Sequence, residues 1–172
     1  MSADDPVEAY HQHAIDALAL LGTAEPSLSA ALRANLSKGM LLAAASFFEF
    51  GLMRHLEHVY RSRLEIAPHL AEFVIKAGME RRYHSLFAWK ENNANQFFAL
   101  FGEDFARRLK ELVAGDDELR TAVRDFMRLG QLRNELAHEN FAAYSLNLTL
   151  DEVFTLYQSA RKFLAELQMQ IT

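Results

Sequence analysis

The segment LGQLRNELAHENF, residues 129–141, places an arginine, an asparagine and a histidine among the leucines of a helix that would be expected to pack. An imidazole titrates near pH 7 and can accept or donate a proton there. A guanidinium can bind a phosphate and stabilise the charge added in its transition state. RNA carries its own nucleophile, the 2′-OH, so its metal-free cleavage needs little beyond a base, an acid and a cation. Arg133, Asn134 and His138 are therefore the candidate catalytic residues.

The spacing of these residues constrains how they can cooperate. On a regular helix, Arg133 and His138 stand about 140° apart around the axis. They share no face unless the helix ends or loosens between them, whereas Asn134 and His138 can share one. An intact helix would present Arg133 and His138 on the two flanks of one apolar stripe, and that stripe could pair with a second copy about a two-fold axis. Each half of the composite cleft would then receive Arg, Asn and His.

Spacing alone has little specificity, because Arg63 and His69 repeat it with one more intervening residue. Other histidines and carboxylates have spacings found in metal sites: Glu8–His11, Glu135–His138, His11–His13 and His55–His58. The Glu-x-x-His pairs suit di-iron bundles, which also need carboxylates from two further helices, and Glu49 could be one. The histidine pairs have no obvious third ligand. Solvated or capping histidines are the favoured interpretation, and neither a metal nor a cofactor is expected.

Other catalytic motifs do not occur in the chain. It has no cysteine, no G-x-S-x-G, no G-x-x-x-x-G-K-[ST] and no G-x-G-x-x-G. Two basic clusters, Arg81–Arg82 and Arg107–Arg108, could contact an RNA backbone, although such charges usually lie on the wet face of a helix. Glu49 lies in the apolar run SFFEF. Burying a carboxylate there costs free energy unless it is paired or lies at a cleft. The alternative places Glu49 on the exposed face of an amphipathic helix.

Composition predicts one folded domain over residues 1–172, since 51% of the residues are hydrophobic. The net charge of −5 argues against a protein that coats nucleic acid by bulk electrostatics, but not against a local basic cleft. The longest apolar run, MLLAAASFFEFGLM, is interrupted by Glu49 and is shorter than a membrane span, so no membrane association is expected. The acidic N-terminus has no secretion-signal pattern, and with the lack of cysteine it predicts a cytoplasmic location.

Local signals predict an all-α bundle of about five or six helices, one of them long. Asp5 should cap a first helix that begins at Pro6, and Asp116 and Thr149 should cap two later ones. The expected helical segments, with their breaks, are residues 6–22, 27–66, 69–86, 97–115 with a division or kink at Gly102, 117 into the 129–141 segment, and 149–168. SLNLTL, residues 145–150, should be an extended connector.

The wider segment RLGQLRNELAHENFAAY, followed by LTLDEVFTLYQSARKFLAEL, resembles the HEPN superfamily and, within it, the RiboL-PSP-HEPN type. Its signature is R-x4–6-H, commonly with Asn after the Arg, then NF, an extended connector and a T-x-x-E helix. The upstream LLAAASFFEF is similar to the family's S-x-FE helix, and FAWKENNANQFFALFG to the segment that precedes its signature helix. The resemblance covers roughly residues 35–170. Glu139 departs from the pattern, because an uncharged residue commonly follows the histidine.

The resemblance implies an all-α domain that dimerises through the motif helix and acts as a metal-independent endoribonuclease in toxin–antitoxin or phage-defence systems. His138 would be the acid or base, Arg133 the phosphate-binding residue and Asn134 their polar neighbour, while Glu49 matches an upstream acid of the family loosely. Glu139, outside the family pattern, is a candidate supporting residue that could raise the His138 pKa or disfavour a nearby phosphate. RNA would be the substrate, and an antitoxin or regulatory protein a further partner. The alternative is a non-catalytic HEPN-like helical dimer that binds RNA, a nucleotide or a protein.

Overall fold

The computed structural model describes residues 5–21, 26–63, 68–79 and 82–172 of the chain. In chain order its elements are α1 (Pro6–Leu21), α2 (Pro26–Arg63), α3 (Pro68–Val74), the π-helical turn η1 (Ile75–Met79), α4 (Tyr83–Leu86), α5 (Asn95–Ala99), α6 (Glu103–Gly115), α7 (Asp117–His138) and α8 (Leu150–Gln170). No β-strand occurs in these ranges, so the all-α class and the long helix are confirmed. The predicted number of helices was too low, because residues 68–115 form several short ones.

The predicted helix over residues 69–86 was wrong. The α-helix ends at Val74, widens into the π-helical turn, and α4 then forms one separate turn. Gly78 lies in the π-helical turn, and glycine is a poor helix former because ordering its backbone costs the most entropy. The predicted break before Pro68, residues 65–67, lies outside the described residues.

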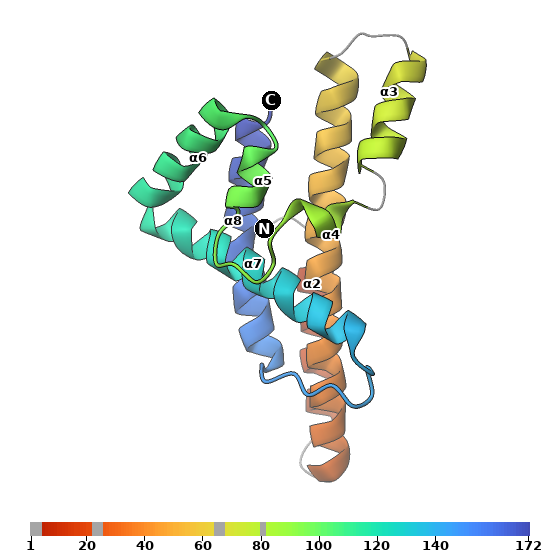
Figure 1. Ribbon diagram of the computed structural model, residues 1–172. Coiled ribbons are helices and arrows are strands. Elements are labelled where there is room, and N and C mark those ends of the chain that lie inside the picture. The colour runs from red at the N-terminus through yellow and green to blue at the C-terminus, as the bar shows by residue number, and fades with distance from the viewer. Residues whose placement is uncertain (1–4, 22–25, 64–67, 80–81) are drawn as a thin grey trace.

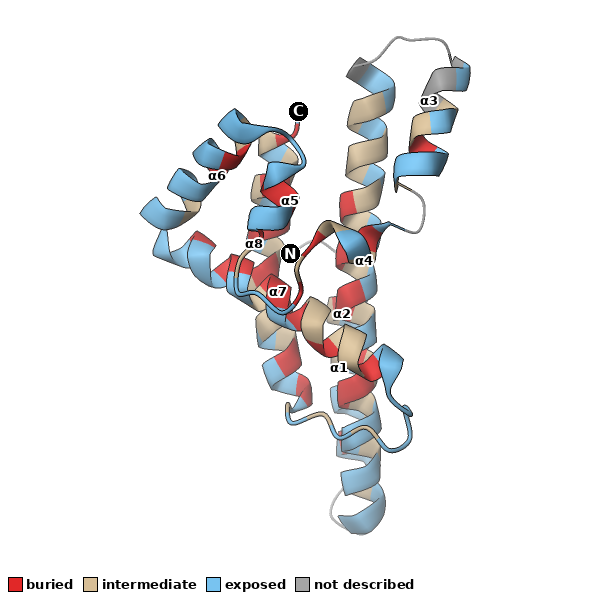
Figure 2. Ribbon diagram, viewed as in Figure 1, coloured by how far each residue is buried: buried red, intermediate tan, exposed pale blue. Residues whose placement is uncertain are grey.

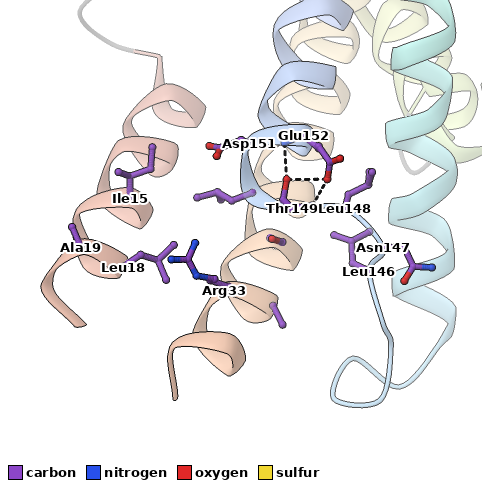
Figure 3. Close-up of a pocket in the computed structure, with 13 residues that line it drawn as sticks. Ile15, Leu18, Ala19, Arg33, Leu146, Asn147, Leu148, Thr149, Asp151 and Glu152 are labelled. Carbon is purple, nitrogen blue, oxygen red and sulfur yellow. Dashed lines mark hydrogen bonds between the residues drawn. The ribbon is translucent and has the colours of Figure 1, made fainter. Parts of the chain in front are cut away.

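Helix starts follow the predicted caps. The Asp5 carboxylate accepts the backbone amides of Val7 and Glu8 at the start of α1. Asp116 accepts two backbone amides at the start of α7, and Thr149 forms a reciprocal capping box with Glu152 at the start of α8 (Figure 3). The division at Gly102 is also confirmed: its φ of 93° lies in the left-handed region, which glycine adopts without a steric penalty.

Helices α2, α7 and α8 form the centre of the bundle (Figure 1). The most extensive contact joins α7 to α8, and α2 packs on both of them. Helix α1 packs on α2 and α8, while α6 contacts the beginning of α7. Burial concentrates along these contacts (Figure 2), where Phe126 of α7 makes edge-to-face contacts with Phe48 of α2 and Phe163 of α8. The core therefore fixes the position of α7, the helix that holds the candidate catalytic residues.

One segment of α2, residues 26–62, is long and apolar enough to cross a membrane by length and composition. The core helix of a folded domain passes the same test. In the structure α2 packs against α1, α7 and α8, and Met40, Leu41, Ala44, Phe48 and Leu52 are buried there. Core packing accounts for these residues, while Leu28, Leu42 and Phe50 of the same helix are exposed.

Candidate functional site

Helix α7 runs without interruption through Arg133 and Asn134 and ends at His138. Leu129, Leu132 and Leu136 of the same helix are buried and anchor its last three turns in the core. Because the helix is regular here, Arg133 and His138 project from different sides of it, as their spacing predicts. In a single copy of the chain the two side chains are therefore held rigidly but on separate flanks.

Arg133 lies in a polar cluster formed by three helices, and its side chain is 28% exposed. One of its terminal nitrogens, Nη1, is 3.3 Å from Nδ1 of His84 on α4 and 3.4 Å from Oδ1 of Asn134. The other, Nη2, is 4.0 Å from Oε2 of Glu49 on α2. The guanidinium is thus oriented by neutral and acidic acceptors while part of it stays open to solvent.

Glu49 belongs to the same cluster. Its side chain is 39% exposed, and Oε2 lies 3.9 Å from Nε2 of His84 as well as near Arg133. The carboxylate lies at the edge of the core beside two basic groups, which lessens the cost of a charge in an apolar run.

His84 is a member of the cluster that sequence reasoning missed. Its ring lies between Arg133 and Glu49, 49 residues before Arg133 in the chain. Burial lowers the pKa of His84, and the positive charge of Arg133 lowers it further, while Glu49 partly opposes them. No sequence motif predicts a contact between YHSL, residues 83–86, and the 129–141 segment. The only local indication of a functional site near His84 was the pair of basic residues before it.

His138 is exposed at the end of α7 and lines a groove of about 500 Å³. The other lining residues come from the segment after α4 and from α7 and its C-cap: Trp89, Lys90, Gln131, Asn134, Glu135 and Glu139. Arg133 faces a different, nearly filled cavity beside Glu49 and His84. Trp89 and Asn134 line both cavities, and Asn134, which belongs to α7, connects the Arg133 side of that helix to the His138 side.

Trp89 holds the segment that carries Lys90 against α7. Its indole lies over Gly130, where an added Cβ would stand 2.0 Å from a ring carbon, so only glycine permits this contact. The indole Nε1 donates to the backbone carbonyl oxygen of His84 at 2.8 Å. One buried side chain therefore positions both the groove and the turn that presents His84.

The remaining candidate residues are distributed elsewhere. Arg107 pairs with Asp104 and Arg108 lies over the Phe105 ring, both on α6 beside the opposite end of α7. They are not brought to the Arg133 cluster. Arg82 is exposed two residues before His84, and Arg81 lies outside the described residues.

The Glu–His and His–His pairs whose spacing resembles that of metal sites include residues that bind other groups in the structure. The Glu135 carboxylate accepts from Gln131 and Tyr144, and Glu8 accepts from Arg161. His11 pairs with Asp151 at 2.8 Å, and His55 contacts the backbone carbonyl oxygen of Ile171 at 2.9 Å. Among the described residues, no group of three or more His, Asp or Glu side chains is arranged to hold a metal ion.

A larger cleft, of about 680 Å³, lies between α1, α2 and the start of α8 (Figure 3). Its walls combine aliphatic side chains, such as Ile15 and Leu18, with charged ones: Arg33 of α2 is a cation, and Asp151 and Glu152 at the start of α8 are acids. The lining includes none of the candidate site residues. Its volume exceeds that of the His138 groove, but its two carboxylates have other partners: Asp151 pairs with His11, and Glu152 belongs to the capping box of Thr149.

A family model described as RiboL-PSP-HEPN matches residues 12–172. The chain belongs to the RiboL-PSP-HEPN family. The match extends the resemblance seen in the sequence to nearly the whole chain and includes both α2, with Glu49, and α7. No curated protein and no solved structure matched significantly. The HEPN family includes RNases and non-catalytic members, so membership alone does not assign an activity to this RiboL-PSP-HEPN domain.

Proposed function

We propose that this RiboL-PSP-HEPN domain is a metal-independent endoribonuclease that acts as a homodimer. The observation that carries the proposal is the arrangement at the end of α7: a partly exposed Arg133 oriented by His84 and Glu49, and an exposed His138 beside a groove. A cation for phosphate and a proton-transfer group thus lie on one rigid helix.

The proposed reaction is intramolecular transfer within RNA. A base takes the proton of the 2′-OH, the 2′-oxygen attacks the adjacent phosphorus, and the bond from phosphorus to the 5′-oxygen breaks. An acid protonates the departing 5′-oxygen, which leaves a 2′,3′-cyclic phosphate and a 5′-hydroxyl. His138 would transfer protons, and Arg133 would stabilise the charge on the phosphoryl oxygens.

The proposed reaction needs Arg133 and His138 side chains at the same phosphate, and a dimer would provide them. Arg133 and His138 of one copy open on different flanks of α7, so one copy does not place both on the same phosphate. A two-fold axis beside the motif helix would bring His138 of each copy into one cleft and supply both acid and base. Asn134, which lines both cavities of the single copy, would lie between the two groups.

The decisive experiment is RNA cleavage in EDTA. Purified wild-type protein is incubated with total tRNA and structured RNA, beside His138→Ala and Arg133→Ala. Each variant should lose at least about 100-fold in rate. Matched controls are His58→Ala and Arg124→Ala, which remove exposed residues of the same types from α2 and α7 and should cleave like wild type. Equal background cleavage by all five proteins would refute the nuclease.

The same site also supports a second candidate function, which is RNA or nucleotide binding without cleavage. It is favoured by the acidic groove wall, where Glu135 and Glu139 lie beside His138 and would repel a phosphate. Retained RNA binding without cleavage would support it. For the proposed nuclease, a toxin or phage-defence role and an antitoxin partner predict growth arrest on expression that His138→Ala abolishes.

A further inference from the structure

We infer that His84 is a positioning residue that holds the Arg133 guanidinium through its neutral ring, so that the Arg133 site is intact only while His84 is unprotonated. Its role in catalysis rests on the proposed nuclease function. The pairing itself is a property of the folded domain and does not depend on RNA.

The contact between the two side chains determines which form of His84 can make it. Arg133 Nη1 always carries hydrogen and can only donate. His84 Nδ1, 3.3 Å away, must therefore accept, which puts the ring proton of neutral His84 on Nε2. Nε2 is the atom that lies 3.9 Å from the Glu49 carboxylate, so the same tautomer directs its N–H toward an acid. Both ring nitrogens are thus matched to their neighbours in a single tautomer.

Protonation of His84 would remove this arrangement. A doubly protonated ring has no acceptor, and it would place a positive charge against the Arg133 guanidinium. Arg133 would then keep only Asn134 at 3.4 Å and Glu49 at 4.0 Å as acceptors. The guanidinium would be free to swing away from the position set by α4.

The charges around His84 favour its neutral form. Arg133 contacts it from α7, and His138 acts on it through space from the end of the same helix. Glu49 lies near it on α2, and on α4 itself Tyr83 packs edge-to-face on the ring while Arg82 is exposed. Burial and Arg133 lower the pKa of His84 most, Glu49 raises it by less than either, and His138 lowers it slightly further. Burial raises the pKa of Tyr83, which stays neutral. His84 is therefore mainly an acceptor at pH 7, and it takes up its second proton only below the ordinary histidine pKa of 6.5.

The first test measures the pairing without RNA. Long-range proton–nitrogen spectra of nitrogen-15-labelled protein follow the His84 ring from pH 5 to 8 in wild type, Arg133→Gln and the control Arg124→Gln. We expect the proton on Nε2 in wild type, a higher titration midpoint for His84 in Arg133→Gln, and an unchanged midpoint in Arg124→Gln. A proton on Nδ1, or the same midpoint in Arg133→Gln and wild type, overturns the inference.

The second test measures the consequence for catalysis, using His84→Ala, His84→Asn and the control His58→Ala. Loss of the acceptor in His84→Ala should lower kcat about 10- to 100-fold, the scale of a misplacement of about 1 Å. The asparagine Oδ1 occupies the place of Nδ1 and does not protonate at these pH values. His84→Asn should therefore keep more activity than His84→Ala and lose less rate than wild type below pH 6.5, the ordinary histidine pKa. His84→Ala with the wild-type rate and pH profile would overturn the positioning role.

The two tests separate this inference from the proposed function. If wild-type protein cleaves no RNA, the nuclease proposal and the catalytic role of His84 fail together, while the spectra still decide whether His84 binds Arg133. If wild-type protein cleaves RNA but the titration midpoint of His84 is the same in Arg133→Gln and in wild type, the nuclease proposal stands and the inference fails.

Discussion

The indole Nε1 of Trp89 donates to the backbone carbonyl oxygen of His84 at 2.8 Å. This contact connects the loop that lines the His138 groove to the turn that presents His84 to Arg133. The Trp89 ring also lies directly on α7 at Gly130. The geometry around Arg133 therefore depends on a packing contact one turn earlier in the same helix.

Gly130→Ala should disturb this contact, because the new Cβ would stand 2.0 Å from the Trp89 ring. Overpacking of this kind costs about 1–3 kcal/mol, measured as a lower free energy of unfolding in urea. The control is Gly115→Ala, where nothing lies within 4 Å of the added atom and the free energy should change by less than about 0.5 kcal/mol. Equal stability of Gly130→Ala and wild type would show that Trp89 does not pack there.

Asp5 should make the stability of the domain depend on pH. Burial raises the pKa of its carboxyl group, but the Tyr157 hydroxyl, two backbone amides and Arg161 outweigh burial and lower it below the ordinary 3.8. A pKa that is lower in the folded than in the unfolded state adds stability above 3.8, and this stability is lost as the pH falls through the folded value.

Asp5→Asn isolates this effect, since asparagine also caps helices well. At pH 7 the variant should lose about 1–2 kcal/mol, the scale of hydrogen bonds to a charged group. The difference from wild type should shrink as the pH falls below 3.8, measured by urea unfolding at several pH values. A difference that stays constant down to acid pH would contradict the role of the charge.

Lys38 should hold the connector after His138 in place. Only 5% of the residue is exposed, and its ammonium group donates to the backbone carbonyl oxygen of Phe141 at 2.8 Å and lies 5.0 Å from the centre of that ring. Lys38→Met keeps the apolar stem and removes the ammonium group. Hydrogen exchange of the amides in residues 139–149 should become faster, with those in α8 unchanged. Unchanged exchange in the connector would exclude this anchoring role.

Asp116 should stabilise the start of α7. Its carboxylate accepts the amides of Glu118 and Leu119 at 2.9 and 3.0 Å. Asp116→Ala should lower the free energy of unfolding by about 0.5–2 kcal/mol, while Asp116→Asn, which can still cap, should lose only a few tenths. The cap would be unimportant if both variants unfolded at the same urea concentration as wild type.

The dimer proposed above predicts a specific cross-link. The chain has no cysteine, so Ala137→Cys introduces a single thiol at an exposed position beside His138. A short bis-maleimide should join two copies of this variant, because a two-fold axis beside the motif helix brings position 137 near its copy. Ala19→Cys, exposed on α1, is the control and should stay monomeric on a denaturing gel. Equal cross-linking of the two variants would argue against this interface.

The local features of the fold could be predicted from the sequence. The caps at Asp5, Asp116 and Thr149, and the division at Gly102, depend on residues within a few positions of one another. The prediction was wrong in residues 69–86, where apolar residues at helical spacing did not show that the chain would widen at Ile75–Met79 and restart at Tyr83. A periodic pattern reports which residues can be buried, but not how the neighbouring helices force the chain to turn.

By itself, the sequence determined the all-α class and indicated the family, since these depend on local patterns, and it named Arg133, Asn134 and His138 as candidates. Only the tertiary structure decided what surrounds Arg133. Glu49 and His84 are 84 and 49 residues before it, and they meet it because α2 and α4 pack beside α7. Contacts at such separations leave no spacing in the sequence, because they are set by the burial of whole helix faces.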